Sequence, residues 1–453
     1  MAKIIHRVAP LASKKQLELA QSRAHQLLLH ENPAVLIGNF KPMVEYFLTR
    51  KRQILKLAHQ HPTPFYILDQ LELTKALMSF KAAFLKYLPE SEHYYAVKVN
   101  HYPEIIKQVV ANGYGLDVSS SQELRLGLSL GADKLVFSGP AKKEADLSLA
   151  VNHYKKVTVN LDSFSELARL AKIASHKKKV VRAGVRIFTK YHGLWNKFGI
   201  NLKDLKKFWH QAEQYPSVNL KGIQFHISWN ETSLPYQQVI KELAVYLKAN
   251  FKPADLEKIK FIDIGGGFRT YQTEGYYPWR IRQGRLIKET SEFYHQKPKF
   301  SQRYFITPAV KIDEYAKGIG QAVDKHLRPL VSCAYYTEPG RYLVNNAMHI
   351  LTQVIDVKGR NYGVADGGIN AIGWERFYYE YCPLINLTHP ALREIIFTLY
   401  GSLCMTDDLW GYYVYAQEMK EGDLILVPYQ GALTYSLAQD FIKPIPPVYL
   451  LKT

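Results

Sequence analysis

One lysine stands near the end of a short, largely apolar and aromatic run at residues 94–100. Such a run is typical of a buried strand, and a lysine in that setting is costly to bury in its charged form. Lys98 can direct its amine out to water, or its amine can have a lowered pKa and form a Schiff base with a carbonyl compound. Taken by itself, the solvent-directed lysine is the commoner case.

Three later segments carry groups that bind anions and move protons. Glycines 265–267 follow an apolar run, and glycine lets a backbone approach a phosphate closely. Residues 338–341 read Glu-Pro-Gly-Arg, which supplies a carboxylate and a guanidinium able to pair with phosphate in bidentate fashion. Cys404 offers a thiol whose usual pKa of about 8.5 suits proton donation. Each has an ordinary structural alternative, such as a flexible turn, an ion pair or a packed thiol, but together they favour the covalent lysine.

The elements that must position these residues alternate along the chain. Eight short runs rich in β-branched and aromatic residues predict strands, and most precede an amphipathic helix; Asp69, for example, is expected to cap one. This pattern favours a parallel (β/α)8 barrel, with a doubly wound sheet as the alternative. The barrel is preferred because the chemical residues fall where strands end, and barrels place their sites there. The predicted strands span residues 65–68, 94–100, 115–118, 135–137, 157–159, 180–187, 220–227 and 259–264.

The ends of the chain differ from this middle part. A helical pattern at residues 14–30 predicts an N-terminal helical extension that packs elsewhere, on the β domain, and a further helix is expected at about 309–323. After residue 341 short strand-like runs separated by turns predict a separate β domain. The expected division is 1–60 for the extension, 61–335 for the barrel and 336–453 for the β domain, whose strands include 348–357, 395–399, 412–417 and 424–427.

Bulk composition narrows the setting. The formal charge is +19, but the lysines are dispersed, which favours a solvated basic surface over nucleic-acid binding. Attraction of anionic substrates is a secondary effect of that charge. No apolar stretch is long enough to cross a bilayer, and the N-terminus lacks the apolar core of a signal peptide. With three cysteines in 453 residues a disulfide framework is not expected, and we expect a cytoplasmic protein.

In their order along the chain these motifs, with Gly401-Ser-Leu-Cys404, resemble the pyridoxal-phosphate (PLP)-dependent ornithine, diaminopimelate and arginine decarboxylases of the alanine-racemase-like fold (fold type III). The resemblance covers roughly residues 60–450. It implies a PLP-binding TIM-like barrel with a C-terminal β-barrel or sandwich domain, and a homodimer with shared active sites. The activity implied is decarboxylation of an amino acid or amino-acid conjugate, through a Lys98 aldimine and a quinonoid, with no metal.

The resemblance also assigns roles. Glu338 matches the acid at the pyridine nitrogen, which makes the ring an electron sink. Arg341 matches a phosphate ligand, His226 a histidine that stacks on the ring, and Cys404 a thiol that enters the partner's site and protonates Cα. The implied cofactor-binding set is Lys98, Asp117, Arg186, His226, Gly265, Gly266, Gly267, Glu338, Arg341 and Tyr435.

The sequence departs from the family pattern at several positions. After His226 the family has Gly-Ser two and three residues on, whereas this chain has Ser228 and Trp229. An aspartate is missing after Cys404, and a family tyrosine is replaced by Leu433, for which Tyr435 is the nearest substitute. Neither the arginine of diaminopimelate decarboxylases nor the Tyr-Asp pair of ornithine decarboxylases is intact. The remaining substrate-binding candidates are Trp374, Arg376, Glu380 and Asp407.

These departures point to a substrate with a longer or more aromatic-lined tail than ornithine, such as those of siderophore or other secondary metabolism. A PLP-dependent racemase or epimerase is one alternative, although Glu338 and Cys404 argue against it because alanine racemases place an arginine at the ring nitrogen. A PLP-binding protein without catalysis is another, and Leu433 and the methionine at position 405 are the features in its favour.

Overall fold

The computed structural model describes residues 13–30, 39–192, 197–373 and 376–451. Eight parallel strands form a closed barrel, because β12 pairs with both β2 and β9 and completes the ring. The predicted (β/α)8 barrel is therefore confirmed, and the doubly wound alternative is wrong. The barrel strands are β2 (Ser91–Ala96), β3 (Gly115–Val118), β4 (Leu135–Phe137), β5 (Val157–Leu161), β6 (Val181–Phe188), β8 (Val218–Gln224), β9 (Phe261–Asp263) and β12 (Ala334–Thr337).

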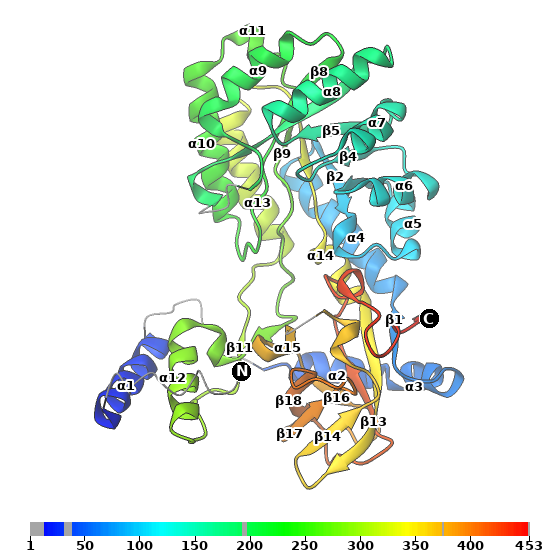
Figure 1. The fold of residues 1–453 in the computed structure, drawn as a ribbon, viewed down its shortest axis with the longest axis vertical. Helices are drawn as coiled ribbons and strands as arrows, with labels where there is room; N and C mark the ends of the chain where they lie inside the picture. Colours follow the sequence, from blue (N-terminus) through cyan, green and yellow to red (C-terminus); the bar gives the residue numbers. More distant parts are fainter. Residues whose placement is uncertain (1–12, 31–38, 193–196, 374–375, 452–453) are drawn as a thin grey trace, which may run out of the picture.

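Helices surround this barrel in the upper part of Figure 1. Their apolar stripes pack on the strands, and several begin at a side-chain cap. Asp69 accepts the backbone N–H groups of Leu71 and Glu72, as expected. The surrounding helices are α4 (Gln70–Tyr87), α5 (Pro103–Ala111), α6 (Ser121–Ser129), α7 (Glu144–Asn152), α8 (Phe164–His176), α9 (Leu205–Glu213), α10 (Leu234–Asn250) and α13 (Ile312–Ala322).

One predicted barrel strand lies in a different sheet. Strand β1 (Phe65–Leu68) pairs antiparallel with β13 (Met348–Lys358) and parallel with β20 (Val448–Leu450). Its assignment to the barrel is wrong, and β12, which was not predicted, provides the eighth barrel strand. Local apolar content identifies a strand, but strand partners are set by contacts with distant parts of the chain.

The second sheet closes into a small barrel of its own. Its strand order is β14-β17-β18-β16-β19-β13-β1-β20, and β14 also pairs with β13. Four of these strands were predicted for the β domain and are confirmed: β13, β17 (Glu394–Tyr400), β18 (Leu409–Tyr415) and β19 (Leu424–Val427). Strands β14 (Tyr362–Ala365), β16 (Leu384–Asn386) and β20 were not predicted.

The N-terminal helices make two separate contacts. Helices α2 (Lys41–Thr49) and α3 (Lys51–Gln60) share an apolar cluster with β-domain residues, which includes Phe47, Ile54, Leu351 and Ile385. Helix α1 (Lys14–His30) instead packs on α12 (Arg282–Phe293), beside the β domain in Figure 1. Within the described residues no helix is both long and apolar enough to span a membrane.

Candidate active site

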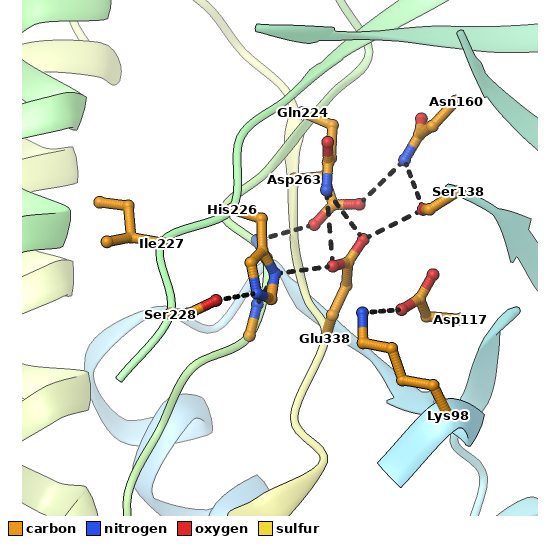
Figure 2. A network of polar contacts seen from close by, with 12 residues as sticks. Lys98, Asp117, Ser138, Asn160, Gln224, His226, Ile227, Ser228, Asp263 and Glu338 are labelled. Carbon is orange, nitrogen blue, oxygen red and sulfur yellow. Dashed lines mark hydrogen bonds and ion pairs between the residues drawn. The ribbon is translucent and has the colours of Figure 1, made fainter. Parts of the chain in front are cut away.

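Each strand of the barrel brings a polar or charged side chain to the same end, and Figure 2 labels all of these residues except Arg186. The carboxyl ends of parallel barrel strands meet on one face, so these side chains converge although they are far apart in sequence. They are Lys98 after β2, Asp117 in β3, Ser138 after β4, Asn160 in β5, Arg186 in β6, Gln224 in β8, Asp263 in β9 and Glu338 after β12.

Lys98 lies in a 3₁₀ turn, Val97–Val99, directly after β2 rather than within a strand. Its two neighbours are buried, whereas 44% of the lysine side chain is exposed. The amine Nζ lies 3.7 Å from Asp117 Oδ2. The amine therefore faces a cavity and a carboxylate, and it is not confined in the apolar core as a strand position would require.

Glu338 lies at the centre of a polar network and is 2% exposed. Gln224 Nε2 donates to its Oε1 at 3.2 Å, Ser138 Oγ lies 3.4 Å from the same oxygen, and His226 Nδ1 lies 3.4 Å from Oε2. Burial by itself would raise the pKa of Glu338, but the contact with His226 and the charge of Lys98 lower it to about 2. Glu338 is therefore ionised, and its long contacts leave it able to accept a cationic N–H.

Two further carboxyl groups are buried beside Glu338. Burial, together with repulsion from Glu338, raises the pKa of Asp117 to about 7 and raises that of Asp263 well above its usual value. Both carboxylate oxygens of Asp117 have no hydrogen-bond partner within the described part of the chain. A buried acid without donors is costly, so this end of the barrel is built to receive a positively charged group.

His226 joins this network to the glycine loop. Gly266 N–H donates to His226 Nδ1 at 3.1 Å, and His226 Nε2 lies 3.2 Å from Ser228 Oγ. Burial lowers the pKa of His226 to about 4, so the ring is neutral near pH 7. A neutral imidazole suits the stacking role that the sequence implied.

The three glycines fit only as glycines. Gly265 and Gly267 have φ of +71° and +93°, which favour glycine. A Cβ at Gly266 would lie 2.2 Å from the Glu338 carbonyl oxygen, and one at Gly267 would lie 2.1 Å from the Ile227 carbonyl oxygen. The loop therefore presents bare backbone next to Glu338 and His226, as an anion cradle requires.

A cavity of about 130 Å³ joins these groups. Lys98, His226, Gly267, Glu338 and Arg341 all line it. An amine, an ionised acid and a glycine–arginine anion site therefore meet at one cavity. In the described residues no cluster of three or more His, Cys, Asp or Glu side chains could hold a metal ion.

A second cavity of about 250 Å³ adjoins the first, and His226, Ser228 and Trp229 line both. Arg186 and the aromatic rings of Tyr191 and Phe198 complete its wall, and the Arg186 guanidinium lies 4.5 Å from the centre of the Phe198 ring. Arg186 is thus next to the cofactor pocket and not within its lining.

Tyr435 does not line either cavity. Its ring packs against Tyr66, His101 and Tyr102, with centroid distances of 5.3–5.5 Å. Leu433 lines the 130 Å³ cavity instead, and its N–H donates to the Val99 carbonyl oxygen at 2.9 Å. The predicted substitution of the family tyrosine by Tyr435 is therefore not seen in this structure.

The remaining predicted site residues, the proposed proton donor and the substrate-binding candidates, lie in the β domain or near it. Cys404 and Asp407 are exposed on the loop between β17 and β18 and do not line the Lys98 cavity of the same chain. Glu380 is half-buried in β15 (Glu380–Tyr381), paired with Tyr276. Arg376 begins α15 (Arg376–Tyr379), but its side chain and all of Trp374 lie outside the described residues.

Several site residues escaped prediction. Ser138, Asn160, Gln224, Asp263 and Arg269 were given no role, although all five are buried. For the first four the sequence signal is a polar residue at the end of an otherwise apolar strand, since a buried polar group requires a partner. Gln224 and Asp263 illustrate it best, because both stand between large apolar residues. Arg269 lies beyond the glycine loop and carries no such signal.

Comparison with known proteins agrees with this geometry. The family described as "Pyridoxal-dependent decarboxylase, pyridoxal binding domain" matches residues 74–345. A diaminopimelate decarboxylase of Neisseria meningitidis serogroup B is 28% identical over 403 residues, 85% of this chain and 87% of its own. A lysine/ornithine decarboxylase of Selenomonas ruminantium is 26% identical over 413 residues, 87% of this chain and 91% of its own.

Solved structures establish the fold. The diaminopimelate decarboxylase of M. jannaschii with L-lysine has a TM-score of 0.72 at 21% identity, covering 88% of this chain and 89% of its own. The diaminopimelate decarboxylase of Helicobacter pylori with L-lysine has a TM-score of 0.69 at 22% identity, covering 88% of this chain and 94% of its own. The racemase and non-catalytic alternatives are set aside. Since the family match spans more than half of the sequence, the chain belongs to the ornithine/arginine/diaminopimelate decarboxylase family and is a PLP-dependent amino-acid decarboxylase.

Proposed function

We propose that this decarboxylase acts on an amino acid or amino-acid conjugate with a longer or more aromatic-compatible tail than ornithine. The observation that carries the proposal is the second cavity, lined by Tyr191, Phe198 and Trp229 beside the Lys98 pocket. Solved relatives hold straight-chain ligands: L-lysine in one structure, and cadaverine, bound together with PLP, in another. An aromatic wall offers apolar surface that such straight-chain ligands do not need. This surface would suit a bulkier substrate of secondary metabolism, siderophore biosynthesis included.

Within this site the residues divide the work. Lys98 would hold the aldehyde carbon of PLP, glycines 265–267 with Arg341 would hold its phosphate, and Glu338 would face its ring nitrogen. When bound, PLP supplies a reactive carbonyl for the substrate amine and an electron-accepting ring. Ionised Glu338 would keep a proton at the nitrogen that it faces, and Asp117, with Oδ2 3.7 Å from Lys98 Nζ, would orient the lysine amine. The neutral His226 shields one side of the pocket from water.

The proton for the substrate carbon needs a further source. In the described residues no thiol lines the Lys98 cavity, so we propose a homodimer in which Cys404 of the partner subunit enters the site. Cys404 is exposed on a short loop whose shape is fixed by Asp408, which accepts N–H groups of Ile369 and Leu403 at 2.8 Å and 2.6 Å. A thiol held this way would deliver its proton to the substrate carbon from outside the barrel. A reducing cytoplasm would keep that thiol from forming a disulfide bond.

The substrate proposal is tested by a carbon-dioxide-release screen with ornithine, lysine, meso-diaminopimelate, arginine and citryl-conjugated amino acids. Ornithine and meso-diaminopimelate should give kcat/KM well below about 10⁴ M⁻¹s⁻¹, because their distal groups would lack a matched buried partner. A bulkier substrate should exceed that value. If either simple substrate reaches it, the altered specificity is wrong while the cofactor site stands.

The cofactor assignment has its own test. Purified protein should be yellow, and borohydride reduction followed by peptide mapping should locate the label on Lys98. Lys98→Ala should abolish both the label and turnover, whereas Lys81→Ala, a lysine on α4 outside the pocket, should affect neither. A Lys98→Ala protein that still becomes labelled and active would contradict the assignment.

A further inference from the structure

Trp229 holds an uncommon backbone conformation beside two arginines. Its φ is +63°, which few bulky residues adopt. The guanidinium carbons of Arg269 and Arg341 lie 4.8 Å and 5.1 Å from the centre of its indole ring. Both distances are within cation–π range, so one ring is in contact with two cations at the mouth of the glycine loop.

The two guanidiniums share one carboxylate. Arg269 Nη1 lies 3.1 Å from Glu274 Oε1, and Arg341 Nη1 lies 3.3 Å from Glu274 Oε2. All three side chains are at most 11% exposed. The charges of Arg269 and Arg280 also act on Glu231. In the two ion pairs themselves, one carboxylate charge is set against two guanidinium charges.

Arg269 has an unused donor. Its Nε is buried and has no hydrogen-bond partner among the described residues. A buried charged donor that makes no hydrogen bond is energetically unfavourable. The same side chain lines the 130 Å³ cavity together with Lys98, Gly267 and Arg341, so a ligand in that cavity is within reach of it.

We propose that Arg269 is a second cationic ligand of the PLP phosphate, acting beside Arg341, and that Trp229 positions both guanidiniums. The proposal rests on the assignment of this cavity to the cofactor. A phosphate monoester carries about −1.5 to −2 charges near pH 7, and each guanidinium can bind it in bidentate fashion.

The test compares PLP with pyridoxal, which has the same aldehyde and ring but no phosphate. Dissociation constants of both are measured on cofactor-free protein by absorbance after equilibrium dialysis. Arg269→Gln should weaken PLP binding by on the order of tenfold to a hundredfold, from the loss of a charged hydrogen bond, and should change pyridoxal binding by less than about twofold. Arg328→Gln is the matched control, since Arg328 pairs with Glu90 and Asp324 and does not line the cavity, and should change neither constant.

Other outcomes overturn the proposal. Equal weakening of PLP and pyridoxal by Arg269→Gln would show a structural role, and no weakening would show that Arg269 does not bind the phosphate. If Arg269→Gln fails to fold, Arg269→Lys is used, and it must lower the PLP affinity selectively as well. Trp229→Ala should act like Arg269→Gln, with Trp229→Phe closer to wild type. Failure of wild-type protein to bind PLP through Lys98 would instead refute the cofactor pocket itself.

Discussion

At the residue scale, the least compensated charge in the site belongs to Asp117. Its pKa of about 7 exceeds the usual value of about 3.8, so between those pH values the folded protein binds more protons than the unfolded chain. Stability must therefore fall as pH rises through this window and level off above it. In cofactor-free protein we expect Asp117→Asn to lose less stability than wild type between pH 4 and pH 8, by on the order of a few kcal/mol.

Urea unfolding at several pH values measures this difference. Asp407→Asn is the matched control, because Asp407 is exposed and its replacement should leave the pH dependence of wild type unchanged. Parallel pH curves for wild type and Asp117→Asn would show that burial of this carboxyl group is not destabilising.

The glycine loop gives a second prediction at this scale. Gly267 and Gly422 have nearly equal φ, +93° and +89°, but a Cβ at Gly267 would lie 2.1 Å from a carbonyl oxygen while one at Gly422 would meet nothing within 4 Å. Alanine at Gly422 should cost about 1 kcal/mol, the backbone strain alone. Alanine at Gly267 should cost clearly more and should also weaken PLP binding.

Thermal unfolding of the two variants, together with PLP titration, separates the cost of backbone strain from the cost of the Cβ overlapping a carbonyl oxygen. Equal melting temperatures and equal PLP affinity for the two variants would mean that the loop can move aside and that the cradle is not rigid.

Sequence reasoning identified the site residues that lie in compact motifs. Lys98, Glu338, Arg341 and Gly267 line one cavity. Tyr435 does not, because its turn directs the ring toward Tyr66 and His101 and leaves Leu433 in the cavity. The orientation of a side chain two positions along a turn depends on local φ and ψ, and Leu433 itself has a φ of +57°, which residue type does not reveal.

At the element scale, a buried ion pair joins three pieces of the barrel. Lys142 Nζ donates to the carbonyl oxygens of Gly139 and Asn160, both at 2.8 Å, and to Glu166 at 2.7 Å. Lys142 and Glu166 are each 1% exposed. Burial lowers the pKa of Lys142 and raises that of Glu166, so each stays charged because of the other.

We therefore expect Lys142→Met to destabilise the protein by about 3–5 kcal/mol, because Glu166 is left as an unpaired buried acid. The double variant Lys142→Met/Glu166→Leu should recover much of that loss. Urea unfolding of the two single variants and the double variant forms the complete cycle. A single-variant loss below about 1 kcal/mol would mean that water replaces the missing partner.

Element positions were predicted better than element partners. Seven of the eight proposed barrel strands overlap strands of the barrel, since their apolar runs carry a local signal. Strand β1 has the same local signal, but its neighbours β13 and β20 are hundreds of residues away. Strand β12 was not predicted because only two of its residues, Tyr335 and Tyr336, are large and apolar, so its local signal is weak.

At the scale of the whole molecule, the proposed dimer predicts complementation. Lys98→Ala and Cys404→Ala chains should each be nearly inactive alone. In a mixed dimer one site receives an intact Lys98 from one chain and an intact Cys404 from the other. Random assortment makes half of the dimers mixed, so roughly a quarter of wild-type sites should return. Activity after refolding a mixture measures this recovery, with subunit exchange verified by mass.

If exchange is proven and activity does not return, Cys404 acts in its own chain or outside the site. No sequence pattern decides between these arrangements, because a motif records which residues are needed and not which copy provides them. The exposed position of Cys404, away from the Lys98 cavity of its own chain, is what makes the shared site the preferred one.

The pairing of β1 with β13 and β20 also bears on biosynthesis. During translation the strands β2 to β12 emerge one after another and can close into the barrel among themselves. Strand β1 has already left the ribosome by then, but its neighbour β13 follows the last barrel strand and its neighbour β20 is synthesised last. All four of its residues, buried in the finished protein, therefore lack one or both partners on the nascent chain, and residues 65–68 are where we expect a chaperone to bind until the final strand arrives.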